Sequence, residues 1–156
     1  MLFPTHLAVA ALIGRRSGLS TPWLVAGATL PDLLDKPLGM AGVTTLFHSV
    51  GHSLVLLLPA VLIALRGPAG LAAAVGWASH LLADAVHVVV NGRPADALFL
   101  FWPAVLPPDP LGIPPGDFFL FYLGTPSFYL EVLLWLALAA ALVRDYRSEG
   151  SEAAGP

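Results

Sequence analysis

Long apolar runs, broken by only a few polar positions, dominate the pattern of this chain. Three of them extend from His48 to Arg66, from Ala69 to Val90 and from Pro126 to Arg144. A helix needs about 20 mostly apolar residues to cross a bilayer, so each run predicts a long membrane span. Pro59 lies inside the first run and predicts a kink there, because proline removes a helical hydrogen bond.

Two shorter apolar segments precede these runs and predict two short N-terminal helices. They extend from Thr5 to Gly14 and from Thr21 to Leu30, and the second is expected to stop at Pro31. Both are shorter than a perpendicular span requires. We therefore expect them to insert partly into the membrane or to pack against the long spans.

The remaining segments predict a loop and a tail. Residues 91–125 are rich in proline, glycine and aromatic side chains, which is typical of a loop at the membrane interface. Residues 148–156 are polar and predict a disordered tail. The overall prediction is an all-α integral membrane bundle of about three long spans and two short helices. It forms a single membrane-embedded domain over residues 1–147.

Composition supports the membrane assignment and limits the chemistry. Hydrophobic residues make up 57% of the chain, charged residues 11%, and mean hydropathy is +0.81, whereas soluble domains carry roughly 25% charged residues. The net charge of −3 and the scattered Lys and Arg residues offer no basic surface for nucleic acid. Because the chain has no cysteine, any metal must be held by His, Asp or Glu.

Arginine positions predict the orientation of the spans. Arg66 ends the first long run, and Arg144 and Arg147 follow the last. The positive-inside rule places these residues on the cytoplasmic side, together with Arg15 and Arg16. Residues 91–125 are then expected on the opposite side.

Two polar pairs are expected at matching depth within the predicted spans. At about 1.5 Å per residue, His52 and His80 both lie about 21 Å from the level of Arg66, and His48 and Asp84 lie about 27 Å from it. Each pair has a spacing of four residues. On a helix this spacing would let both members face the same ion.

Polar groups inside apolar segments need compensation, since an acidic side chain at a bilayer centre costs about 2.5 to 3.5 kcal/mol on insertion scales. A divalent cation can supply it. Nitrogen and oxygen ligands without sulfur suit zinc, although manganese and iron also use them. The candidate metal ligands are His6, Asp32, His48, His52, His80 and Asp84, with Asp32 or Asp35 as a candidate general base and with His87 and Glu131 as possible additions.

Taken singly, each polar group also has a purely structural interpretation, because helix ends and turns commonly carry such residues. These interpretations are a surface or capping role for His6, hydrogen bonds of His48 and His52 to Ser49, Ser53 or the backbone, caps at Asp32 and Asp35 with an Asp35–Lys36 pair, solvation of His87, and a Glu131–Arg93 pair. Taken together, the groups favour a metal site.

Four stretches occur in a recognisable order: TH at residues 5–6, GATLPDLLD at 27–35, HSVGHS at 48–53 and GWASHLLADA at 76–85. This order resembles the inner-membrane, metal-dependent hydrolase family that includes a LexA-regulated bacterial member. That family is in turn thought to be similar to zinc-dependent phospholipase C and the P1-type nucleases. The resemblance covers residues 4–87.

The resemblance implies a multi-pass protein of the inner cell membrane that binds one or two zinc ions. It places His6, Asp32, Asp35, His48, His80 and Asp84 on the polar positions of the family, with His52 as a neighbouring possibility. It also implies that Asp84 bridges two ions. One departure is Ser127, which lies four residues before Glu131 where the phospholipases have a histidine.

The function implied by the resemblance is hydrolysis of a phosphoester, with a membrane lipid as partner and a phospholipid-like substrate at the membrane surface. A bound zinc ion would lower the pKa of its water to about 7 and offset phosphate charge. Other classes stay open at this stage. They are a metal or proton transport element, a haem-binding bundle and a membrane protein with only a structural role.

Overall fold

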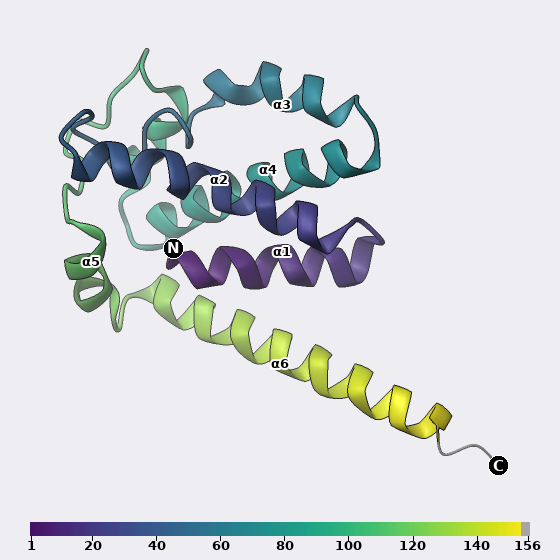
Figure 1. Cartoon of the computed structure of the whole chain (residues 1–156). Helices are drawn as coiled ribbons and strands as arrows, with labels where there is room; N and C mark the ends of the chain where they lie inside the picture. The colour runs from purple at the N-terminus through teal and green to yellow at the C-terminus, as the bar shows by residue number, and fades with distance from the viewer. Residues whose placement is uncertain (154–156) are drawn as a thin grey trace.

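The computed structural model describes the backbone of residues 1–153 and the side chains of residues 1–147, and within that part it is all-α, as predicted. Figure 1 shows the arrangement of the helices. In chain order they are α1 (Phe3–Ser17), α2 (Thr21–Met40), η1 (Leu54–Leu56), α3 (Leu57–Ala64), α4 (Pro68–Val90), η2 (Pro94–Phe101), α5 (Pro115–Tyr122) and α6 (Pro126–Ala153).

Two helices, α4 and the Pro126–Arg147 part of α6, are long and apolar enough to cross a membrane. Both coincide with predicted spans. The second of these helices extends to Ala153 and so enters the segment predicted as a disordered tail. Residues 154–156 lie outside the described residues.

The packing of α2 against α4 forms the centre of the fold, and small residues allow it. A Cβ atom added to Gly27 of α2 would lie 1.9 Å from the carbonyl oxygen of Ala73. A Cβ atom on Gly76 of α4 would lie 2.0 Å from the carbonyl oxygen of Leu24. The two backbones therefore approach each other as closely as glycine permits.

The prediction that the second short helix stops at Pro31 is wrong, since α2 continues through Pro31 and Pro37 to Met40. A proline inside a helix removes one hydrogen bond. Tertiary packing compensates here, because Pro31 is fully buried and the backbone of Gly51 packs directly against it. As a consequence, Asp32 and Asp35 lie inside a continuous helix and cap no helix end.

The prediction of a span from His48 to Arg66 is also wrong. Residues 48–53 are irregular, and the apolar helix that follows covers only Leu54–Ala64, which is too short to cross a bilayer. The Ser53 side chain caps this helix by accepting a hydrogen bond from the Val55 N–H. Pro59 falls in the first turn of α3, where proline is tolerated, so no kink is needed.

The two ends of the molecule carry different polar residues, with arginines at one end and buried histidines and aspartates at the other. The helices α1, α3 and α6 end on the same side in Figure 1. The arginines lie toward these helix ends, and they are Arg15 and Arg16 in α1, Arg66 just after α3, and Arg144 and Arg147 in α6. Arg15 of α1 forms an ion pair with Asp145 of α6 there. The loops after α2 and α4, together with α5, lie at the other end, and so do the buried histidines and aspartates described next.

Candidate metal centre

Two buried histidines from different parts of the chain meet at the centre of the site. His52 lies on the irregular segment before η1, and His80 lies on α4. Their Nε2 atoms are 3.0 Å apart, and both residues are at most 1% exposed. Both rings are shielded from water, so the chemistry of the site depends on whether a proton or a metal ion lies between these two nitrogens.

Asp35 of α2 fixes the orientation of the first ring. The Nδ1 atom of His52 lies 2.7 Å from Asp35 Oδ2, and the same carboxylate accepts the backbone N–H groups of Ser49, Gly51 and His52 at 2.6, 2.9 and 3.2 Å. These bonds also explain why residues 48–53 leave the predicted helix, since their N–H groups have a partner elsewhere.

The hydrogen bonds keep Asp35 ionised. Burial alone would raise the pKa of its carboxyl, but hydrogen bonds from His52 and the backbone outweigh burial and lower the pKa to about 2. An ionised Asp35 accepts a hydrogen bond from Nδ1–H of His52. The Nε2 atom of His52 is therefore the nitrogen that faces the centre of the site.

A backbone carbonyl fixes the second ring in the same way. Nδ1 of His80 lies 2.6 Å from the carbonyl oxygen of Ala28, which can only accept a hydrogen bond. The proton of a neutral His80 is therefore on Nδ1, and Nε2 carries a lone pair. Two such lone pairs at 3.0 Å repel each other unless a positive charge lies between them.

The surrounding carboxylates favour that positive charge. Burial would lower the pKa of His52, but hydrogen bonds to Asp32, Asp35 and Asp84 overcome this and raise it to about 9. A proton or a metal ion can occupy this position. Histidine ligands of metal ions commonly donate their second ring N–H to a carboxylate or a backbone carbonyl, as both rings do here.

Asp84 of α4 supplies an oxygen at matching distance. Its Oδ2 atom is 3.2 Å from His80 Nε2 and 3.4 Å from His52 Nε2. A tetrahedral zinc ion with bonds of about 2.0–2.1 Å holds its ligand atoms about 3.3 Å apart. Asp32 Oδ1 lies slightly farther out, 3.5 Å from His52 Nε2 and 3.9 Å from His80 Nε2. The donor set thus fits a divalent ion of this size.

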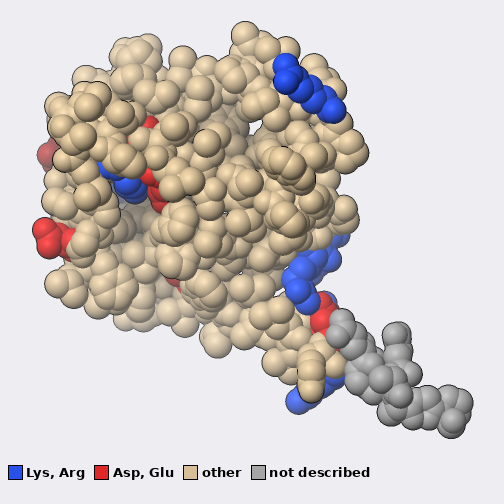
Figure 2. All heavy atoms as spheres, in the orientation of Figure 1, with Lys and Arg blue, Asp and Glu red and all other residues tan. Residues whose placement is uncertain are grey.

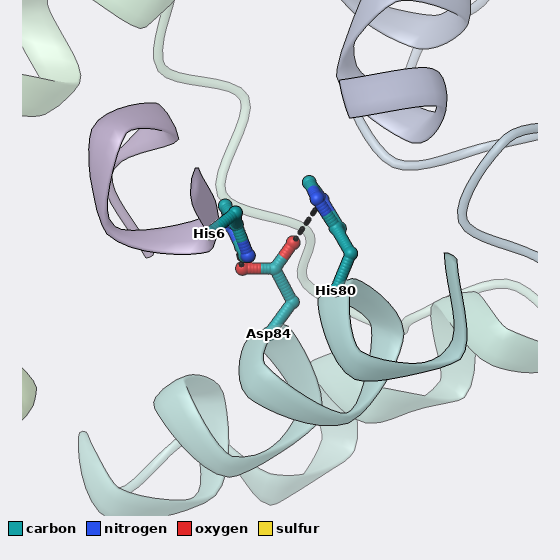
Figure 3. Close-up of side chains that lie close together, drawn as sticks. All are labelled: His6, His80 and Asp84. Atoms are coloured by element: carbon teal, nitrogen blue, oxygen red, sulfur yellow. Dashed lines mark ion pairs between the residues drawn. The ribbon is translucent and has the colours of Figure 1, made fainter. Parts of the chain in front are cut away.

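The other oxygen of Asp84 faces a second group of donors. His6 of α1 places Nε2 3.3 Å from Asp84 Oδ1, and the amino group of Met1 lies 2.6 Å from the same atom. The rings of His6 and His80 stack with centroids 3.6 Å apart, and Figure 3 shows both rings beside the Asp84 carboxylate. Neither ring nitrogen of His6 has a hydrogen-bond partner within the described part of the chain.

The sequence-predicted ligands therefore converge on one place. Three overlapping groups have ligand atoms within 4.8 Å of one another, and they are His6–His80–Asp84, Asp32–His52–His80 and His48–His52–Asp84. His48 is the least buried member, and its Nε2 atom lies 3.5 Å from Asp84 Oδ2. All six candidate ligands thus belong to one cluster around Asp84.

Several of the purely structural interpretations are wrong. Lys36 lies 3.2 Å from Asp32 and not beside the carboxylate of Asp35. His6 is buried in the cluster and caps no helix end. The sequence analysis did not predict the hydrogen bond between Asp35 and His52, because the two residues are 17 positions apart and no local pattern relates them.

The predicted additions to the site lie next to it. Glu131 of α6 is buried and accepts hydrogen bonds from the Leu2 N–H and the Thr5 hydroxyl, so it supports the start of α1. Arg93 pairs instead with Asp96 at 2.6 Å. His87 is buried rather than solvated, and its ring stacks on that of Tyr122 with centroids 4.9 Å apart.

A cavity of about 660 Å³ gives access to the cluster. Asp32, His48, Asp84 and His87 line it, together with Lys36 and many apolar side chains. Figure 2 shows charged groups of both signs inside a hollow at the left of the view, surrounded by uncharged surface. A small molecule can therefore approach the Asp84 cluster from outside the helical core.

The arrangement can hold a metal ion close to a substrate-sized space. Its buried nitrogen and oxygen donors are pre-oriented, and the cavity reaches them from one side. Comparison with protein-family models, with curated proteins and with solved structures finds no match to this chain.

Proposed function

We propose that this protein is a membrane-embedded, metal-dependent hydrolase that cleaves a phosphoester of a lipid-like substrate. One observation carries the metal: the Nε2 atoms of His52 and His80 face each other at 3.0 Å while both Nδ1 atoms are tied to acceptors. The family resemblance over residues 4–87 supports the hydrolase assignment.

His52, His80 and Asp84 are the proposed ligands of the first ion. Three protein ligands with one open position are typical of catalytic zinc sites, and a chain without cysteine can use only nitrogen and oxygen donors. A bound zinc ion would act as a Lewis acid, lowering the pKa of a coordinated water and offsetting phosphate charge. His6, 3.3 Å from Oδ1 of Asp84, is available to a second ion on that oxygen. His48, 3.5 Å from Oδ2, is a further candidate ligand beside His52 and Asp84.

The two aspartates of α2 have different proposed roles. Asp32 lines the cavity beside the ligand atoms, so it is placed to accept the proton of the attacking water. Asp35 is fully buried, and its oxygens are occupied by His52 and three backbone N–H groups. It acts as a positioning residue. Lys36 lines the cavity next to Asp32 and can contact a substrate phosphoryl group.

The exposed side chains support a lipid environment. Leu82 on α4 and Leu133 and Leu136 on α6 are apolar and exposed on helices long enough to span a bilayer. The arginine-bearing helix ends lie opposite α5, whose side chains line the cavity, so the positive-inside rule favours a cavity near the outer face of the inner membrane. Phe119 and Phe121 of α5 are exposed there.

Metal analysis of the detergent-purified protein, combined with a phosphoesterase assay, tests the proposal. We expect about one or two zinc ions per chain, zinc-dependent cleavage of a phosphoester, and loss of both in His52→Ala. Val61→Ala on the exposed side of α3 is the matched control and should keep both. Metal-free protein whose stability is unchanged by chelation would contradict the proposal.

A further inference from the structure

The cavity beside Asp84 combines two kinds of surface. Asp32, His48 and Asp84 gather at the metal cluster, where their ligand atoms lie within a few ångströms of His52 and His80. The rest of the lining is largely apolar, with side chains from α1, from the loop after α2 and from α5. A ligand that matches both parts has one polar end and an apolar chain.

The charged groups that line the cavity determine whether the polar end of such a ligand should be anionic or cationic. Lys36 lies 3.2 Å from Asp32, and Arg93 pairs with Asp96 at 2.6 Å, so these four groups largely balance each other. Asp84 is the remaining carboxylate of the lining, and the amino group of Met1 lies 2.6 Å from its Oδ1 atom, so this pair is balanced as well. A divalent ion on Asp84 makes the polar end of the cavity net positive, which favours an anionic headgroup.

Aromatic side chains line the part of the cavity that lies next to the metal cluster. The ring of Phe99 lies 5.2 Å from that of His48, and the ring of Phe118 lies 5.8 Å from that of His87. Both aromatic residues line the cavity. His87 follows Asp84 by one turn of α4, so an apolar surface begins directly beside the metal ligands.

From these observations we infer that the cavity binds an anionic amphiphile with a phosphoryl headgroup, the headgroup at the Asp84 cluster and the alkyl chain along Phe99 and Phe118. The inference rests on the proposed function for the metal that attracts the headgroup. It adds a binding site for the chain inside the protein, so that the substrate enters the cavity and is not cleaved at the flat membrane surface.

Calorimetric titration of the whole, zinc-loaded chain in a non-ionic amphipol tests the inference with a series of alkyl phosphates from butyl to dodecyl. Each additional methylene group should tighten binding by up to about fourfold until the cavity is full, after which affinity should level off. Inorganic phosphate tests the headgroup alone. Dodecyltrimethylammonium tests the chain with the opposite charge, and both should bind at least tenfold more weakly than dodecyl phosphate.

Two valine substitutions on α4 separate the cavity from the outer surface. Val88 lines the cavity, whereas Val86 is exposed on the same helix. Val88→Trp should weaken dodecyl phosphate binding at least tenfold and leave zinc content unchanged. Val86→Trp should leave both unchanged. The ligand series on the unmodified chain decides the question if Val88→Trp does not fold.

The possible failures are distinguishable. Equal affinity for butyl and dodecyl phosphate, or equal binding of dodecyl phosphate by folded Val88→Trp and Val86→Trp, would overturn the inference while zinc binding, and with it the proposed function, stands. Tighter binding of the ammonium amphiphile would overturn the assigned headgroup charge. A chain that binds no zinc would overturn the proposed function, and the chain-length series on that sample would still decide whether the apolar site exists.

Discussion

His52 and His80 direct their Nε2 atoms at each other across 3.0 Å, although one ring belongs to an irregular segment and the other to α4. The opposite nitrogen of each ring is held by an acceptor, Asp35 in one case and the carbonyl of Ala28 in the other. These two buried hydrogen bonds therefore hold both Nε2 atoms at the same place in the site. A cation shared between the two nitrogens, either a proton or a metal ion, fits this geometry.

Asp84→Asn tests the carboxylate at the centre of the cluster. The substitution keeps the shape of the side chain and removes its charge, so we expect zinc affinity to fall at least about tenfold, as it does when even outer partners of metal ligands are changed. Zinc content and phosphoesterase activity are the measurements. Asp109→Asn is the control, because the Asp109 side chain is 95% exposed. Full zinc content in Asp84→Asn would remove Asp84 from the ligand set.

Asp35→Asn distinguishes a positioning residue from a general base. The amide has one acceptor oxygen where the carboxylate has two, and it no longer holds His52 electrostatically. We expect zinc affinity to drop by about 10- to 100-fold, together with activity. Isothermal titration with zinc measures the first quantity, and Asp117→Asn on exposed α5 is the control. Unchanged zinc affinity with lost activity would instead assign Asp35 to proton transfer.

Gly76→Ala tests the close approach of α2 and α4. The added methyl group would lie 2.0 Å from the carbonyl oxygen of Leu24, so the helices must separate. Overpacking of this kind typically costs about 1–3 kcal/mol and sometimes more. The thermal midpoint should fall by roughly 2–4 °C for each kcal/mol in a chain of this size.

Gly116→Ala is the matched substitution for that measurement, because its Cβ atom would meet no atom within 4 Å. It should leave the thermal midpoint within a degree or so of the unmodified protein, since surface changes are usually within about 0.5 kcal/mol. Equal midpoints for the two alanine variants would mean that the helices pack less closely than the structure shows.

Cysteine labelling tests the orientation in the membrane, and the absence of native cysteine makes single-cysteine variants unambiguous. Leu65→Cys lies beside Arg66 at the arginine-bearing end and leaves the arginines intact. Gly116→Cys lies on α5 at the opposite end. A membrane-impermeant maleimide should label Gly116→Cys in intact cells and Leu65→Cys only after permeabilisation. Labelling of both in intact cells would refute this orientation.

Features that depend on spacing within one helix could be predicted from the amino-acid sequence alone. The apolar runs predicted the position of α4 and the start of α6, because a long stretch of apolar residues favours a helix that can cross a membrane. The four-residue spacing of His80 and Asp84 put both on one face of α4, and their ligand atoms are 3.2 Å apart. Local geometry alone is enough for these results.

The way in which the other candidate ligands reach that face depends on contacts between distant parts of the chain. Asp35 draws residues 48–53 out of helical geometry, so His48 and His52 join the cluster from an irregular segment and not from a span. Packing against α4 and Gly51 carries α2 through Pro31, which local propensity alone would stop. In both cases the deciding partner is distant in sequence, and a local pattern contains no information about hydrogen bonds and packing supplied from elsewhere in the chain.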